Sequence, residues 1–339
     1  MELLPSLTEI DAAANELSGL LPCTPQYRWP LLCDALGTEV WLKHENHTSV
    51  GAFKVRGGLV YFADLARREK PAGVISATRG NHGQSVGLAA RQHDIKATVV
   101  VPRGNSIEKN ATMRALGVSL VEHGSDFQEA REFAESLSTT HSLHMVESFH
   151  PLLVRGVASY ATEFFRAVQG MDVVYVPIGL GSGICGMIAA RNALNENTSI
   201  VGVVSSHARA YARSLAAGTP LDSPTSTILG DGMACRTPHP EALDVLRGNV
   251  DRIVEVSDDE LAAAMRTIYE CTHNVSEGAG AAAIAAALQE RRRVRGKRVG
   301  AVLSGGNVDR ELFSSVLDGR FRFPAHGDSA TIARSNERA

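Results

Sequence analysis

The sequence predicts an α/β fold in which helices cover sheets of mostly parallel strands. Short apolar, β-branched runs alternate with helical patterns, which is the order expected of βαβ units. Glycine is frequent at 31 residues and aromatic residues make up only 5%. This balance favours tight turns between helix-covered strands over an aromatic-rich β-sandwich. The 339 residues are enough for one large or two mid-sized domains.

The first series of elements predicts a small α/β domain over residues 49–148. Strands are expected at 74–77, 97–101 and 118–121, because each of these short apolar runs ends in glycine or polar residues. Helical patterns at 84–92 and 107–116 lie between them.

A second series predicts a larger domain built from residues 1–48 and 149–339. Near-continuous apolar runs at 173–177, 200–204 and 299–303 are typical of strands buried on both faces. Helices are expected at 184–194, 262–272 and 278–288, the last of which is rich in alanine. From about residue 323 Pro, His, Gly, Ser and Asn crowd together, so we expect a poorly ordered tail.

Composition excludes several classes of protein. A net charge of -3 and a charged fraction of 21% argue against disorder and against nucleic-acid binding. The five cysteines are scattered without a C-x-x-C pair, and no run is apolar enough to cross a membrane. We expect a cytoplasmic protein that acts on a small molecule, with no nucleic-acid or membrane partner.

The segment from Gly51 to Gly58 places Lys54 between glycines, just before an apolar helical stretch. A lysine amine can hold a carbonyl cofactor as a Schiff base when burial and nearby cations lower its pKa. Taken alone, the pattern is more typical of a solvated surface lysine.

A polar turn follows the strand at 74–77 and opens a helix. Its residues are Thr78, Arg79, Gly80, Asn81 and His82. Polar groups and backbone N–H donors converge in such a turn, so it could bind an anion such as a carboxylate. A purely structural turn, with His82 bonded only to its neighbours, is the alternative.

A glycine-rich turn, Gly179-Leu180-Gly181-Ser182-Gly183, lies between the strand at 173–177 and the helix at 184–194. Glycines let backbone amides approach a phosphate, and the helix N-terminus adds partial positive charge. The pattern therefore favours a phosphate site over a purely structural turn.

The same turn also matches the dinucleotide fingerprint G-x-G-x-x-G, through Gly181, Gly183 and Gly186. An acidic residue should then close the next strand, but the strand at 200–204 is followed by Ser205, Ser206 and His207. An NAD-dependent oxidoreductase is therefore the lesser alternative.

Together with Ser304-Gly305-Gly306-Asn307 after the last strand, these clusters resemble the fold-type II pyridoxal-phosphate (PLP) enzymes. The resemblance is closest to the threonine and serine dehydratase (ammonia-lyase) group and covers about residues 15–320. It implies a tryptophan synthase β-like fold, with PLP between two open twisted α/β domains. It also implies that the larger domain binds the cofactor. We expect the protein to form a homo-oligomer, namely a dimer.

The resemblance assigns a role to each cluster. Lys54 would be the Schiff-base lysine and catalytic base, with Phe53 beside the cofactor ring. Asn81 would bond the phenolic oxygen, and Gly179, Leu180, Gly181, Ser182 and Gly183 would hold the phosphate. Ser304 would meet the pyridine nitrogen as a second catalytic residue, and Glu277 would lie near the ring. Thr78, Arg79, Gly80, Asn81 and His82 would bind the substrate carboxylate.

The implied reaction is α,β-elimination, in which a β-hydroxy-α-amino acid gives a 2-keto acid and ammonia. Since the hydroxyl of Ser304 cannot hold a proton on the ring nitrogen as an aspartate would, the ring is a weaker electron sink. Elimination is then favoured over transamination.

Departures from the family pattern refine these expectations. Val157-Ala158-Ser159 stands where relatives have Gln-Gly-Thr, and Ala52 replaces their serine. Loss of these polar groups indicates a substrate bulkier than threonine or serine, such as phenylserine, unless it is ordinary packing variation. Arg79 replaces the serine base of serine racemases, so we expect little racemase activity. Val204 and Ala210 stand near where some relatives ligate a divalent cation, so no such divalent metal site is expected, although backbone oxygens could still bind a monovalent ion. A non-catalytic protein that binds PLP or an amino acid is the other alternative.

Overall fold

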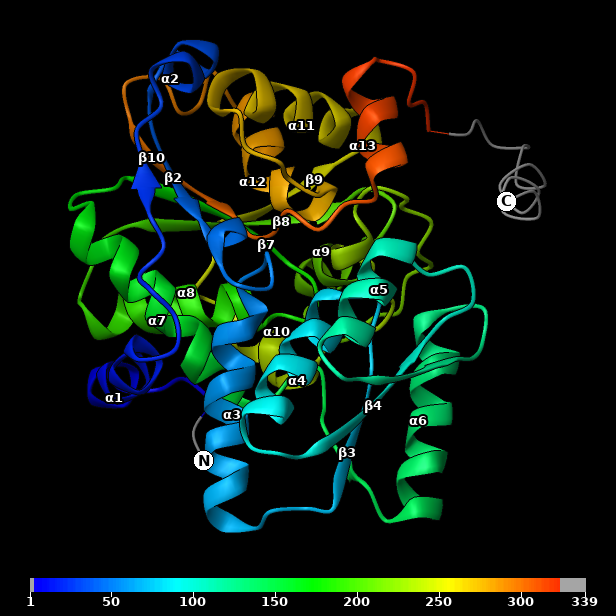
Figure 1. Cartoon of the computed structure of the whole chain (residues 1–339). Coiled ribbons are helices and arrows are strands. Elements are labelled where there is room, and N and C mark those ends of the chain that lie inside the picture. Colours follow the sequence, from blue (N-terminus) through cyan, green and yellow to red (C-terminus); the bar gives the residue numbers. More distant parts are fainter. Residues whose placement is uncertain (1–2, 324–339) are drawn as a thin grey trace.

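Two sheets with helices on both faces make up the computed structural model, which describes residues 3–323 (Figure 1). The fold is α/β with two open sheets, as the sequence predicts. All six predicted strands are present, each within one residue of its predicted bounds. The predicted tail lies almost entirely outside the described residues.

The larger sheet has six strands in the order β1-β2-β10-β7-β8-β9. The antiparallel strand β1 (Gln26–Tyr27) forms its edge, and all other pairs are parallel. The remaining strands are β2 (Glu39–His44), β10 (Arg298–Leu303), β7 (Val173–Pro177), β8 (Ser199–Ser205) and β9 (Arg252–Val256).

The apolar runs of this sheet are buried on both faces. Val173 and Tyr175 pack in one core with helices α2, α11, α12 and α13, whereas Val174 and Val176 pack in another with α7, α8, α9 and α10. This alternation is the two-residue period of a strand. It explains why the runs carry no polar residues at alternate positions.

The smaller sheet has four parallel strands in the order β5-β4-β3-β6. They are β5 (Ser119–Glu122), β4 (Lys96–Val101), β3 (Gly73–Ala77) and β6 (His144–Met145). Helices α3 and α4 cover one face, and α6 covers the other. All four strands fall within the predicted small domain; the exact division at residues 48/49 and 148/149 stays a prediction.

The helices have the following bounds: α1 Leu7–Ser18, α2 Pro30–Leu36, α3 Lys54–Arg68, α4 Asn81–Gln92, α5 Ile107–Ala115, α6 Phe127–His141, α7 Pro151–Ala167, α8 Ser182–Ala193, α9 Ala210–Ala217, α10 Pro240–Leu246, α11 Asp258–Thr272, α12 Gly278–Gln289 and α13 Arg310–Leu317. Two 3-10 turns, η1 (Glu45–His47) and η2 (Asp231–Met233), complete the structure.

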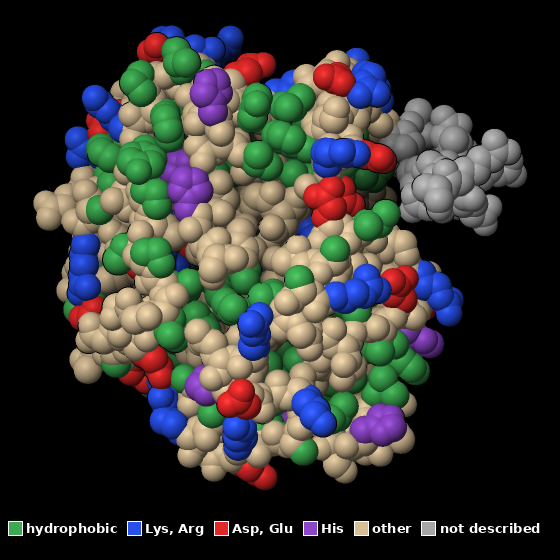
Figure 2. Space-filling view, viewed as in Figure 1, with side chains coloured by type: hydrophobic (Ala, Val, Ile, Leu, Met, Phe, Trp, Pro, Cys, Tyr) green, Lys and Arg blue, Asp and Glu red, His purple; other side chains and the backbone are tan. Residues whose placement is uncertain are grey.

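No helix among residues 3–323 is long and apolar enough to span a membrane. On the face shown in Figure 2, basic and acidic side chains are interspersed.

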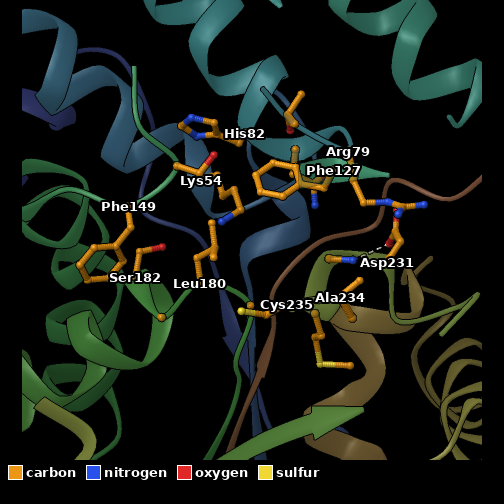
Figure 3. A pocket seen from close by; sticks show the side chains of 18 of the residues that line it. Lys54, Arg79, His82, Phe127, Phe149, Leu180, Ser182, Asp231, Ala234 and Cys235 are labelled. Carbon is orange, nitrogen blue, oxygen red and sulfur yellow. Dashed lines mark hydrogen bonds between the residues drawn. The ribbon is translucent and has the colours of Figure 1, made fainter. Parts of the chain in front are cut away.

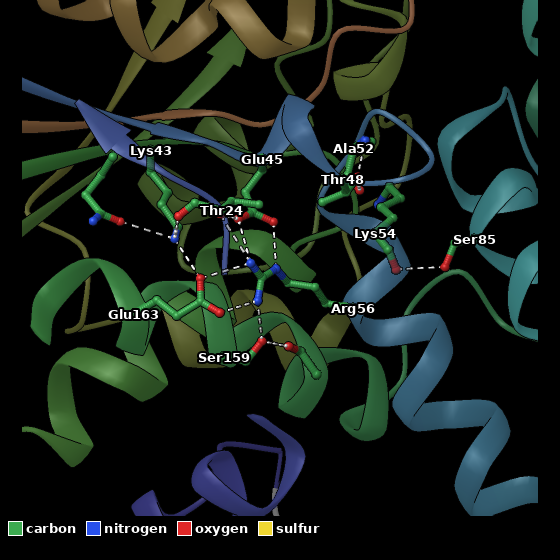
Figure 4. Close-up of polar contacts among 12 residues, drawn as sticks. Thr24, Lys43, Glu45, Thr48, Ala52, Lys54, Arg56, Ser85, Ser159 and Glu163 are labelled. Carbon is green, nitrogen blue, oxygen red and sulfur yellow. Dashed lines mark hydrogen bonds and ion pairs between the residues drawn. The ribbon is translucent and has the colours of Figure 1, made fainter. Parts of the chain in front are cut away.

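A buried ionic network fixes the start of α3 (Figure 4). Arg56 pairs with Glu45 at 2.8 Å and with Glu163 of α7 at 2.7 Å, and Lys43 of β2 also pairs with Glu163 at 2.7 Å. Each buried charge has an opposite partner, which burial requires. Because Arg56 lies two residues after Lys54, the network anchors the turn that carries Lys54.

Candidate active site

A cavity of about 540 Å³ lies between the two sheets and is lined by residues of both (Figure 3). Thr78 follows β3, Gly179 lies two residues after β7, and Ser304 follows β10, so all three lie at the carboxyl ends of parallel strands. Ligands of open α/β sheets bind at this edge. All the residues that the sequence analysis proposed for the site line this one cavity: Phe53, Lys54, Thr78, Arg79, Gly80, Asn81, His82, Gly179, Leu180, Gly181, Ser182, Gly183, Glu277 and Ser304.

Lys54 is the first residue of α3, and its side chain enters the cavity. Its Nζ lies 4.9 Å from the centroid of the Phe53 ring. Burial lowers the pKa of Lys54 to about 8, with the Glu277 carboxylate opposing the shift. The amine can therefore be neutral at mildly alkaline pH, as a nucleophile or base requires. Burial accounts for this lowering of the pKa, and no neighbouring cation among residues 3–323 contributes to it, contrary to the expectation from the sequence.

Asn81 begins α4, and its side-chain amide is held from two directions. Its Nδ2 donates to Glu277 Oε1 at 2.6 Å, and its Oδ1 accepts from Asn307 Nδ2 at 2.9 Å. A carboxylate only accepts hydrogen bonds, so the two partners fix which end of the amide is the donor. The second N–H of Asn81 can then donate to a bound oxygen.

The glycine-rich turn precedes α8, whose N-terminus faces the cavity. Gly181 has a φ of 108°, and a Cβ there would lie 2.6 Å from the Cβ of Ala242, so only glycine fits. Tyr211 Oη donates to the carbonyl of Leu180 at 2.8 Å and holds the turn in place. The first N–H groups of a helix have no partner within the helix, so this end can bind an anion.

The charged side chains that line the cavity are almost all paired with one another. Its four carboxylates belong to Asp126, Glu147, Asp231 and Glu277, and each meets an arginine or lysine that also lines the cavity. Two cavity cations, Lys54 and Arg79, form no ion pair with any residue from 3 to 323. The Nε of Arg79 is buried with no hydrogen-bond partner among these residues. The cavity therefore has unbalanced positive charge for an anionic ligand.

His82 is buried beside Lys54, and burial lowers its pKa to about 3, with the Lys54 charge contributing. The imidazole is thus neutral at physiological pH. Its Nε2 is buried and meets no hydrogen-bond partner within the described part of the chain. Such an atom costs free energy unless a ligand satisfies it.

These features fit pyridoxal phosphate. The cavity offers a lysine of lowered pKa for an aldehyde, a helix N-terminus with a glycine turn for a phosphate, and a fixed amide donor for a phenolic oxygen. The Ser304 hydroxyl makes one long bond of 3.4 Å to the Ala279 carbonyl, so it can turn to a ring nitrogen.

The structure changes the interpretation of several sequence features. Ala52, Val157 and Ala158 do not line the cavity, so their apolar character does not indicate a bulkier substrate. Val157 and Ala158 instead pack against Gly186 of α8, where a Cβ would lie 2.8 Å from Val157 Cγ1. Close helix packing also explains the third glycine of the dinucleotide pattern, because Gly186 is not a cavity residue.

Six charged cavity residues have no signal in the sequence: Lys109, Asp126, Arg131, Glu147, Asp231 and Arg236. Two of them, Lys109 of α5 and Asp231 of η2, form a pair whose Nζ and Oδ2 atoms are 2.7 Å apart. The pair joins segments 122 residues apart, so no local pattern could have found it.

Comparison with known proteins gives a consistent result. The family model described as pyridoxal-phosphate dependent enzyme matches residues 17–305. The chain is 32% identical to L-threonine ammonia-lyase of Thermotoga maritima, over 92% of this chain and 78% of that protein. It is 28% identical to L-threo-3-hydroxyaspartate ammonia-lyase of Saccharomyces cerevisiae, over 94% and 98%.

A solved structure agrees with these relatives. The processed threonine deaminase isoform 2 of Solanum lycopersicum matches with a TM-score of 0.83 at 28% identity, over 94% of this chain and 95% of that one. The chain therefore belongs to the pyridoxal-phosphate-dependent enzymes, within their group of threonine dehydratase-like ammonia-lyases.

Proposed function

We propose that this enzyme converts a β-hydroxy-α-amino acid, with threonine and serine as the first candidates, to a 2-keto acid and ammonia. The observation that carries the proposal is Lys54, a lysine with a pKa of about 8 in a cavity whose other groups suit PLP. When bound, PLP supplies the electron sink for the electrons of the Cα–H bond.

Each cluster has a task in this proposal. The backbone amides of the turn from Gly179 to Gly183 hold the phosphate, and Asn81 Nδ2 donates to the phenolic oxygen. The Ser304 hydroxyl bonds the pyridine nitrogen without charging it, which favours elimination over transamination. The residues from Thr78 to His82 hold the substrate carboxylate, and Arg79 supplies the positive charge.

The neutral Lys54 amine accepts the Cα proton as a general base. The β-hydroxyl leaves with a proton as water, and the resulting enamine takes up water to give the 2-keto acid and ammonia. One water molecule is released and one is taken up, so the net reaction converts the amino acid to a 2-keto acid and ammonia.

The roles of these residues leave several side chains possible for the substrate. One relative's name is L-threonine ammonia-lyase and another's is L-threo-3-hydroxyaspartate ammonia-lyase, so both side chains are candidates. Phe127, Phe149 and Leu180 line the cavity and give it apolar surface, which keeps phenylserine as a candidate on grounds other than Ala52 or Val157.

The test measures 2-keto acid release from threonine, serine, phenylserine and 3-hydroxyaspartate by the purified PLP-loaded enzyme. Release that disappears in Lys54→Ala supports the proposal. If no candidate yields a keto acid while PLP is bound, the proposed reaction is wrong.

The homodimer and the cytoplasmic location expected from the sequence remain proposals. Light scattering tests whether the protein is a homodimer.

A further inference from the structure

Lys109 is a buried cation whose side chain links the two sides of the cavity, because it starts beside the smaller sheet and contacts acids beside the larger one. It lies in the first turn of α5, beside the smaller sheet, and its side chain is 6% exposed. Its Nζ lies 2.7 Å from Asp231 Oδ2 and 3.1 Å from Glu277 Oε2. Both acids belong to segments that pack with the larger sheet.

Glu277 needs this cation because it is buried at the centre of the site. Its side chain is 4% exposed, and burial raises the pKa of Glu277 while the Lys109 ammonium opposes that shift. Oε2 meets Lys109 outside hydrogen-bond geometry, so that contact is ionic. Oε1 accepts a hydrogen bond from Asn81 Nδ2 at 2.6 Å. Hydrogen bonds to an ionised acceptor are shorter and stronger than those between neutral groups.

The backbone around Lys109 is held in place by other contacts. Ser106 Oγ donates to Asp309 Oδ1 at 2.5 Å, and the backbone N–H of Arg310 donates to Glu108 Oε1 at 2.8 Å. The first turns of α5 and α13 therefore cap each other. This docking does not depend on the Lys109 ammonium, so the two contributions can be separated by substitution.

We propose that Lys109 is a positioning residue that acts through Glu277: it is the counter-charge that keeps this carboxylate a pure acceptor and so holds the amide of Asn81 with its N–H groups toward the cofactor site. The inference rests on the proposed role of Asn81 toward the phenolic oxygen.

The removal of Lys109 has two consequences that can be measured. A buried carboxylate without a cation takes up a proton. The protonated Glu277 can then donate a hydrogen bond to the Asn81 amide, so the orientation of this amide is no longer fixed. The negative charge of Glu277 also raises the pKa of Lys54, so its loss lowers that pKa further. Both cofactor affinity and the pH response of the lysine-bound cofactor should change.

A double-mutant cycle on the full-length protein tests this. The variants are Lys109→Met, Glu277→Gln and the double variant. The readouts are the dissociation constant of PLP in reconstitution titrations and the pH midpoint of the visible cofactor band. We expect Lys109→Met to weaken PLP binding by about tenfold or more, the cost of a hydrogen bond to a charged group. It should also lower the pH midpoint.

The cycle should be strongly non-additive, with the double variant matching Glu277→Gln alone, since a neutral amide needs no counter-charge. Additive effects, or a Lys109→Met protein within twofold of the parent, overturn the proposal. Glu108→Ala is the matched control for helix docking, because it removes the contact with Arg310 but keeps the Ser106 cap on the backbone N–H of Lys109, and it should leave both readouts within twofold. If it reproduces the Lys109→Met effects, docking is the cause and the proposal is wrong.

Misfolding is also informative. If Lys109→Met does not fold, the cycle is repeated with Asp231→Asn in every variant, because Lys109 also pairs with Asp231. The proposal then requires Glu277→Gln to restore folding, and failure to do so overturns it. No readout uses a substrate. Absence of keto acid would therefore count against the proposed reaction alone, whereas an additive cycle would count against Lys109 alone.

Discussion

The backbone carbonyl of Ser304 accepts a hydrogen bond from the backbone N–H of Phe53 at 3.1 Å. A second bond runs from Gly306 N–H to the Gly51 carbonyl at 2.9 Å, and Ala52 pairs with Gly305 as an antiparallel bridge. The segment that carries Lys54 and the segment that carries Ser304 are therefore one short ribbon. Two motifs about 250 residues apart in sequence therefore act as a unit, and Gly51 is required in it, because its φ is 67° and a Cβ there would lie 2.6 Å from Asn307 Oδ1.

The lowered pKa of Lys54 predicts a pH-dependent stability of the cofactor-free protein. Between its folded pKa of about 8 and the ordinary value of 10.5, the unfolded chain holds a proton on this lysine that the folded chain lacks. Stability should therefore rise with pH across this window, and below pH 8 the folded protein bears the full cost of the buried charge.

Lys54→Met isolates this effect, because all other groups are shared. Denaturant titrations of both proteins at pH 8 and pH 10 should show the parent gaining up to about 3 kcal/mol relative to the variant at the higher pH. A difference that is the same at both pH values would show that burial does not shift this pKa.

Ser304→Asp should convert a weak electron sink into a strong one. The aspartate would hold a proton on the ring nitrogen, so elimination should slow and a transamination product should appear. Product analysis by chromatography checks this, after PLP binding has been verified by absorbance. A product ratio equal to that of the parent contradicts the proposed role of Ser304.

The sequence predicts strands correctly where their buried residues form a continuous apolar run. The runs at 173–177 and 299–303 are apolar throughout and match β7 and β10. The edge strand β9 was missed because Arg252 and Glu255 interrupt its apolar pattern, and β6 was missed because it has only two residues. The start of α11 was placed four residues late, although Ser257 and Glu260 form a capping box that the sequence displays.

The candidate site was predictable for a different reason. Lys54, Asn81 and Gly181 lie in glycine-punctuated turns at strand or helix ends, where backbone geometry leaves a sequence signature. Lys109 lies in an ordinary helix, and its burial depends on how α5 meets Asp231 and Glu277. Such tertiary pairing has no signature in one sequence.

Gly305→Ala should damage the site without touching its charges. An added Cβ would lie 2.5 Å from Glu277 Oε1 and 3.3 Å from Asn81 Nδ2, so the hydrogen bond between these two side chains would be displaced. We expect a loss of about 1 to 3 kcal/mol in stability, typical of overpacking, together with weaker PLP binding.

Thermal unfolding and PLP titration measure the two effects of Gly305→Ala. Gly19→Ala is the matched control, because a Cβ at that position meets nothing within 4 Å and its backbone is in the right-handed helical region. If Gly305→Ala behaves like Gly19→Ala in both assays, the close approach is not limiting.

Arg79→Ala is the most informative substitution for the substrate, because Arg79 is the cavity arginine without an ion pair among residues 3–323. In Figure 3 its side chain extends from the polar turn toward the segment that carries Asp231. A planar guanidinium binds a carboxylate with two parallel hydrogen bonds, which lysine cannot reproduce. We expect kcat/KM to fall by about tenfold to a thousandfold, or about 1.4 to 4 kcal/mol of transition-state stabilisation.

The comparison of four substrates on parent and Arg79→Ala decides what Arg79 binds. Threonine, serine and phenylserine share only the α-carboxylate, whereas 3-hydroxyaspartate adds a second one. A uniform loss places Arg79 on the shared α-carboxylate or on the cofactor, and PLP titration separates these two. A loss confined to 3-hydroxyaspartate places it on the side-chain carboxylate and makes a dicarboxylic substrate the better candidate. Unchanged kcat/KM with every substrate means that Arg79 does not act in the cavity, and Lys54 and the helix N-terminus alone must then supply the positive charge for the anionic ligand.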